Sequence, residues 1–173
     1  MKNDLKNKFL SDSVLKPSFL CTYMWGFIAH VYAYFSDAFS HDSLVVYATI
    51  RERRWKIQLG RILVPVYRYL TRDGIEIPWP IGLLALFWLG LAVYLTGRVF
   101  YIRSWWGISL IAGLMVTNVT ISTITASYIY ELDFDMLSIT LAVLAVYLWK
   151  VKKHGMWWGS LCVVGILGIY PLR

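Results

Sequence analysis

Long apolar runs alternate with short polar connections along this chain and predict helices that cross a membrane. The apolar runs cover residues 18–35, 81–96, 105–129, 136–149 and 156–170. A helix needs about 20 apolar residues to cross the hydrocarbon core of a bilayer, and a shorter run suffices where its ends lie deep. We therefore expect an all-α polytopic membrane protein with about five transmembrane helices, forming a single membrane domain over residues 1–173.

Residues 36–80 form the only long polar segment between two apolar runs. Within it, apolar residues from Trp55 to Leu70 recur at helical spacing, and four arginines fall on a different face: Arg54, Arg61, Arg68 and Arg72. This pattern is typical of an amphipathic helix lying in the membrane interface. Pro65 lacks a backbone donor, so we expect it to break this helix into two pieces, with Gly60 loosening the join.

The charge of the chain indicates its orientation in the membrane. The formal net charge is +7 and 58% of the residues are hydrophobic. Nucleic acid is not the expected partner, because the basic residues lie mostly beside apolar runs, where they set topology and contact lipid headgroups. Basic residues gather in three short segments that fall on one side: Lys2, Lys6, Lys8 and Lys16; Arg98 and Arg103; Lys150, Lys152 and Lys153. The N-terminus is therefore expected in the cytoplasm, with residues 36–80 as the first outer loop and anionic headgroups holding its arginines.

Polar residues inside the apolar runs have simple structural interpretations. His30 is expected to be a packed, hydrogen-bonded group rather than a proton relay, although ionisable groups within a membrane are functional candidates. Cys21 and Cys162 belong to no ligand motif and are expected to pack as small hydrophobes. The Ser- and Thr-rich stretch 117–127 fits either helix packing or a span end facing a wet cavity.

Two acidic clusters fall on the expected outer side: Asp37 with Asp42, and Glu131 with Asp133 and Asp135 in a short connection. A carboxylate can accept a proton from an attacking hydroxyl or hold a divalent cation against a phosphate leaving group. Nearby arginines can neutralise the phosphates of a lipid-linked donor. The alternative is that these acids are ordinary solvated loop residues. The sequence specifies no cofactor, although Mg²⁺ or Mn²⁺ fits this chemistry.

Six runs carry a resemblance to a known family: FSHDSL at 39–44, LGRILVPVYR at 59–68, PWPIGLL at 78–84, VTN at 116–118, YIYELD at 128–133 and LAVLAVYL at 141–148. In order and spacing they resemble the O-antigen (serotype-converting) glucosyltransferases of the GT-C class. The family continues for several more spans, so the resemblance implies a GT-C-like N-terminal module whose long first periplasmic loop carries the interfacial helices.

The resemblance also implies a reaction and its residues. Such enzymes transfer a glucosyl residue from a polyprenyl-phosphate sugar to lipopolysaccharide O-antigen, on the periplasmic face of the bacterial inner membrane. By position it implies Asp42 as the catalytic aspartate, with Asp37 beside it, and Asp133 or Asp135 as a second acidic site. The residues expected to contact substrate are His41, Arg54, Arg61, Arg68 and Glu131.

A different class of function also fits this sequence. The chain could be a non-catalytic membrane subunit for lipid-linked sugar translocation or assembly, acting with a partner membrane subunit. Paired carboxylates near the bilayer midplane would favour transport. Here the acids lie at span ends, which favours chemistry at the membrane surface.

Overall fold

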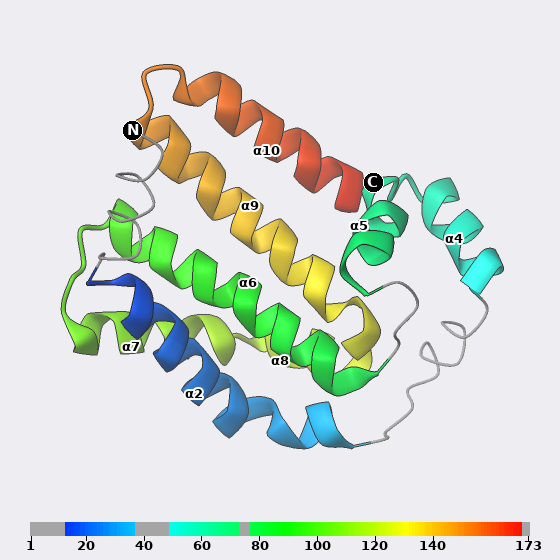
Figure 1. Cartoon of the computed structure of the whole chain (residues 1–173), viewed down its shortest axis with the longest axis horizontal. Helices are drawn as coiled ribbons and strands as arrows, with labels where there is room; N and C mark the ends of the chain where they lie inside the picture. Colours follow the sequence, from blue (N-terminus) through cyan, green and yellow to red (C-terminus); the bar gives the residue numbers. More distant parts are fainter. Residues whose placement is uncertain (1–12, 37–48, 73–76, 171–173) are drawn as a thin grey trace.

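A computed structural model describes residues 13–36, 49–72 and 77–170, without the side chains of residues 49–53. All regular secondary structure in these ranges is helical (Figure 1). The elements are α2 (Leu15–Phe35), α4 (Thr49–Gln58), α5 (Leu63–Thr71), α6 (Pro78–Val99), α7 (Trp105–Val116), α8 (Val119–Ser127), the 3₁₀ turn η1 (Ile129–Glu131), α9 (Leu132–Val151) and α10 (Gly155–Ile169). The all-α fold expected from the sequence is confirmed for the described residues.

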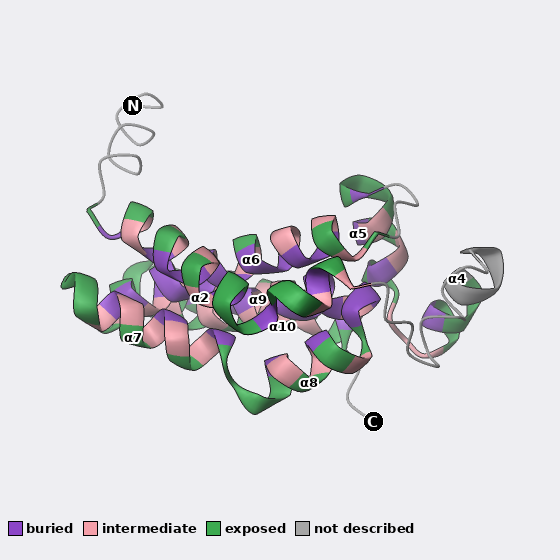
Figure 2. Ribbon diagram, turned by 90° about the horizontal axis from the view of Figure 1, so that it is seen from below, coloured by how far each residue is buried: buried purple, intermediate pink, exposed green. Residues whose placement is uncertain are grey.

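The long helices form an up-and-down bundle. Figure 1 shows α2, α6, α9 and α10 running between the same two ends of the molecule, with α7 and α8 beside α2 and α6. The short α4 and α5 gather at the end where α9 begins and α10 stops. Buried residues concentrate where α6 packs against α2 and against α9, in a core that includes Tyr34, Leu86, Leu89 and Met136 (Figure 2).

The expected count of five spans is only partly reproduced. Among the described residues, two helical segments are long and apolar enough to cross a membrane: Pro78–Val99 and the continuous Ile129–Val151. A third crossing results if the bent pair α7 and α8 counts as one span. The 21-residue α2 has sufficient length but is not among them, and α10 has only 15 residues.

The expected third span, 105–129, is broken into α7 and α8, which meet at an angle of 49°. Asn118 caps α8, since its side-chain oxygen accepts from Thr120 N at 2.9 Å, so Thr120 N does not continue the first helix. Thr117, Thr123 and Thr125 return their hydroxyls to carbonyls four residues earlier. The polar stretch therefore uses its hydroxyls locally, around a helix break.

His30 lies against this break and is packed as expected. It is 7% exposed, and its Nε2 lies 3.0 Å from the carbonyl oxygen of Val116, the last residue of α7. That carbonyl would have accepted from Thr120 N in an unbroken helix.

The expectation for Cys21 is also confirmed. This residue of α2 is a buried free thiol that packs in a core with residues of α6 and α7.

The break between α4 and α5 falls at Gly60, not at Pro65. Gly60 has φ of 81°, a left-handed conformation that glycine adopts without steric cost. Pro65 instead occupies the first turn of α5. The first backbone N–H groups of a helix have no partner inside the helix, so a proline in this turn removes no hydrogen bond. The prediction that Pro65 divides the segment is wrong.

The start of α9 corrects a second expectation. Residues 130–135 were expected to be a loop, but they form η1 and the first turn of α9. Asp133 and Asp135 both lie in that first turn. The positive end of the helix dipole stabilises carboxylates there.

Candidate functional site

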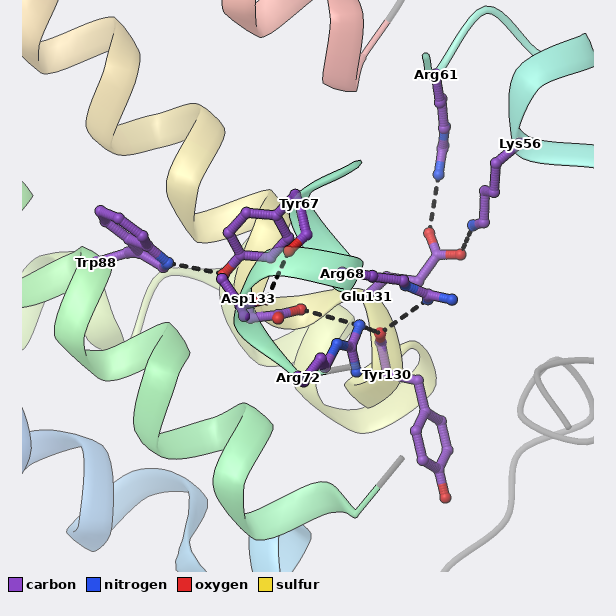
Figure 3. Close-up of polar contacts among 10 residues, drawn as sticks. Lys56, Arg61, Tyr67, Arg68, Arg72, Trp88, Tyr130, Glu131 and Asp133 are labelled. Atoms are coloured by element: carbon purple, nitrogen blue, oxygen red, sulfur yellow. Dashed lines mark hydrogen bonds and ion pairs between the residues drawn. The ribbon is translucent and has the colours of Figure 1, made fainter. Parts of the chain in front are cut away.

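Basic side chains of the α4–α5 region converge on the acids at the start of α9 (Figure 3). α5 is held there by a small core in which Val64, Tyr67, Phe134 and Ile169 pack together. This core joins α5 to the first turn of α9 and the last turn of α10. Packing of α5 therefore places its polar face over the acidic first turn of α9.

Arg72 and Asp133 form a buried ion pair. The Arg72 Nη2 atom lies 3.3 Å from Asp133 Oδ1, and their side chains are 6% and 0% exposed. The same Nη2 donates to the carbonyl oxygen of Tyr130 at 2.7 Å, and Arg68 Nη2 donates to that oxygen at 3.2 Å. Arg68 and Arg72 are four residues apart and share one helical face. The two guanidinium groups are thus fixed beside the Asp133 carboxylate in α9 and the Tyr130 carbonyl in η1.

Glu131 forms a second, more accessible set of ion pairs. It pairs with Lys56 from α4, and Arg61 Nη1 donates to its Oε2 at 2.9 Å. The side chains of Arg61 and Glu131 are 19% and 18% exposed, so this pair lies nearer the surface than Arg72–Asp133. Arg61 also lies 4.6 Å from the ring centroid of Tyr170.

Asp135 is buried beside Tyr170. It is 3% exposed, and its Oδ2 accepts from the hydroxyl of Tyr170 at 3.1 Å. Within the described residues, Asp135 Oδ1 and Asp133 Oδ2 are buried oxygens that accept no hydrogen bond. Buried polar atoms are nearly always satisfied in native proteins, and an exception is a reason to look for a function. Each carboxylate therefore offers one acceptor oxygen to a further group.

Tyr67 closes the side of the site that faces α6. Its hydroxyl accepts from Trp88 Nε1 at 2.9 Å. Burial raises the pKa of the Tyr67 phenol, and the neighbouring charge of Asp133 raises this pKa further. The phenol therefore stays protonated at neutral pH and acts as a neutral hydrogen-bonding group.

The arrangement can bind an anion and handle a proton. Four basic residues, Lys56, Arg61, Arg68 and Arg72, lie beside three acids, Glu131, Asp133 and Asp135. Guanidinium groups suit the oxygens of a phosphate, and a carboxylate suits an exchangeable proton. In the part of the chain that is described, no group of three His, Cys, Asp or Glu residues has the arrangement needed to hold a metal ion.

The structure joins some of the predicted site residues and leaves others apart. Asp133, Asp135, Glu131, Arg61 and Arg68 come together. Arg54 is exposed on α4, and Asp37, His41 and Asp42 lie outside the described residues. The expectation that headgroups hold Arg61, Arg68 and Arg72 is wrong, because all three contact the acidic end of α9 or η1.

Sequence reasoning missed four residues of the site: Lys56, Tyr67, Arg72 as a site residue, and Tyr170. The spacing of Arg68 and Arg72 on one helical face was a usable signal. Tyr170 gave none, since it lies 35 residues from Asp135 at the end of another helix.

Comparison with known proteins decides the family. A family model described as "Glucosyl transferase GtrII" matches residues 31–171. The chain belongs to this glucosyl transferase family. The GtrII match includes every described site residue and every described helix from α4 onward, together with the last five residues of α2. No curated protein and no solved structure matches the chain. Together with the apolar helices, the GtrII family indicates a glycosyltransferase that works in a membrane.

Proposed function

We propose that this protein transfers a glucosyl residue from a polyprenyl-phosphate sugar to lipopolysaccharide O-antigen on the periplasmic face of the bacterial inner membrane. The observation that carries the proposal is the convergence of arginines from the α4–α5 region with buried carboxylates at the start of α9. The GtrII family supports the class of reaction.

The basic residues suit the donor. Arg61 is a partly exposed cation of the site, and its Nη1 lies 2.9 Å from Glu131 Oε2. A donor phosphate can replace Glu131 on Arg61 and exchange one charge-assisted contact for another. Beside these cations, Leu63, Val66 and Leu70 expose apolar side chains on α5. A polyprenyl chain therefore finds an apolar surface next to the groups that bind its phosphate.

The carboxylates suit the transfer step. The acceptor hydroxyl oxygen attacks the anomeric carbon of glucose, the bond from that carbon to the phosphate oxygen breaks, and polyprenyl phosphate leaves. The proton of the hydroxyl passes to a carboxylate base. We assign this role to Asp42, on the resemblance of its FSHDSL run, and a supporting role to Asp135, which keeps a free acceptor oxygen. Asp133 is already neutralised by Arg72 and serves the architecture of the site.

The test is glucosyl transfer by the full chain in proteoliposomes, supplied with polyprenyl-phosphate glucose and an O-antigen acceptor. We expect Asp42→Asn to lower kcat by roughly 10²-fold or more, the usual effect of losing a general base. Asp37→Asn should have a smaller effect. Arg61→Gln should raise KM for the donor with little change in kcat, because it removes ground-state binding of the phosphate. Lys153→Gln, at the other end of the bundle, is the control for removing one positive charge.

Three outcomes would change the assignment. Full activity in Asp42→Asn together with loss in Asp135→Asn places the base at the start of α9. If Asp42→Asn, Asp133→Asn and Asp135→Asn each leave the transfer rate unchanged, the catalytic interpretation of both acidic regions is wrong. Absence of transfer by the wild-type chain contradicts the proposal and favours the non-catalytic membrane subunit.

A further inference from the structure

A second basic site lies at the end of the bundle opposite the Asp–Arg cluster, which comprises Lys56, Arg61, Arg68 and Arg72 with Glu131, Asp133 and Asp135. A pocket of about 120 Å³ opens there between the ends of α2, α6 and α9. Its lining includes Val14, Arg98, Tyr101, Arg103, Tyr147 and Lys150. Three of these side chains are positively charged, and no acidic residue lines the pocket in the described part of the chain. The pocket therefore has the charge of an anion site.

Lys150 is held in a defined position at this pocket. Its Nζ donates to the carbonyl oxygen of Val99 at 2.5 Å and lies 4.4 Å from the ring centroid of Tyr101. An ammonium group has three N–H donors, so the bond to Val99 leaves others for a ligand. Tyr101 has φ of 58°, an uncommon conformation for a residue other than glycine. Non-glycine residues in strained conformations concentrate at functional sites.

Helix capping alone does not account for these charges. α6 and α9 both end near the pocket, and a helix C-terminus is equivalent to about −0.5 charge, so the two contribute roughly −1. α7 begins beside them and adds about +0.5. Arg103 and Lys150 alone carry two full positive charges. The pocket thus keeps a positive excess after both helix ends are neutralised.

Aromatic side chains place this end of the bundle at the depth of lipid headgroups. Phe100, Tyr101, Trp105, Trp106 and Trp149 are all exposed there. Tyr and Trp gather at membrane–water interfaces, and basic pockets between helices bind lipid headgroups. We propose that the pocket lined by Arg98, Arg103 and Lys150 binds the phosphate of an anionic phospholipid. This site is separate from the glucosyl-transfer site and does not depend on the proposed reaction.

The test is competition between two lipids for the purified full chain. The protein in nonionic detergent is given equal amounts of phosphatidylglycerol and phosphatidylcholine, and native mass spectrometry measures which lipid stays bound. Wild type should prefer phosphatidylglycerol. Arg103→Gln with Lys150→Gln should lower the preference by roughly 30-fold, the effect of two basic residues at an anionic surface. Lys152→Gln with Lys153→Gln removes the same charge from exposed positions outside the pocket and should retain most of the preference.

Arg103→Gln alone keeps the test valid if the double variant does not fold, because it leaves the contact between Lys150 and Val99 in place. It should lower the preference several-fold. An equal loss in the Lys152/Lys153 control would mean a diffuse charge effect and would overturn the site. An unchanged preference in the Arg103 variant and in the double variant would overturn it too. Displacement of phosphatidylglycerol by excess inorganic phosphate would show a site for free anions rather than lipid.

Discussion

At the scale of single residues, burial separates two ion pairs that look alike in sequence. Asp133 and Arg72 pair with side chains 0% and 6% exposed, whereas Glu131 and Arg61 pair at 18% and 19%. Removing one partner of a buried pair leaves a charge in a medium that cannot solvate it. A pair near the surface loses much less, because water replaces the missing partner.

We therefore predict unequal costs for two similar substitutions. Asp133→Asn should lower the free energy of unfolding by about 3 kcal/mol, the range for breaking a buried pair. Arg61→Gln should lower it by about 1 kcal/mol or less, the range for a surface pair. Thermal unfolding of both variants in the same detergent measures the difference. Equal costs would contradict the role of burial at the start of α9.

Some residue roles could be predicted from sequence and others could not. His30 was predicted to be packed and hydrogen-bonded because an isolated ionisable group in an apolar run needs a partner, and Val116 supplies it. The acids at 131–135 were correctly chosen as site candidates. Their burial was not foreseen, because it depends on α5 docking over α9, a contact between segments about 60 residues apart.

At the scale of elements, the sequence indicated the helices more reliably than their ends. The helical stripe from Trp55 to Leu70 correctly predicted helix on both sides of a break. The position of the break was wrong, because a proline in the first turn of a helix costs little and a glycine at positive φ ends the preceding one. The 49° bend after Val116 was likewise missed, although Asn118 is a good capping residue.

The hairpin of α9 and α10 depends on two glycines that allow close packing. A Cβ atom on Gly155 would lie 2.1 Å from the carbonyl oxygen of Leu148, and one on Gly159 would lie 3.2 Å from that of Ala145. The two glycines are four residues apart, the spacing that lets helices approach closely in membranes. Backbone atoms cannot move aside as a flexible side chain can.

We predict that Gly155→Ala weakens the packing of α10 on α9. The expected loss is about 1–3 kcal/mol, the usual cost of adding atoms to a packed contact. Met156→Ala, on an exposed neighbour, is the control and should change stability little. Thermal unfolding in detergent measures both, and equal stability of Gly155→Ala and wild type would show that the hairpin can open without cost.

At the scale of the whole molecule, the two ends of the bundle differ in chemistry. One end carries the Asp–Arg cluster, where α5 meets α9 and α10. The other carries Arg98, Arg103, Lys150, Lys152 and Lys153, and no acidic residue of the α6–α7 or α9–α10 connections offsets them. Such an excess of basic residues is typical of cytoplasmic ends. The proposed reaction needs the Asp–Arg cluster on the opposite, periplasmic side.

This orientation can be tested by cysteine labelling in intact cells. The background is Cys162→Ser, with Cys21 retained because it is fully buried. Leu70→Cys lies on the exposed face of α5, where the side chain is 75% exposed, and Lys153→Cys lies in the basic connection between α9 and α10. A membrane-impermeant maleimide should label Leu70→Cys and leave Lys153→Cys unlabelled until the cells are permeabilised. Asp133 is unsuitable for this purpose, since a residue with no exposed surface would escape the reagent on either side.

Labelling of Lys153→Cys but not Leu70→Cys would place the Asp–Arg cluster in the cytoplasm, where O-antigen on the periplasmic face is out of reach. That result would contradict the proposed acceptor while leaving the anion-binding chemistry of the cluster intact.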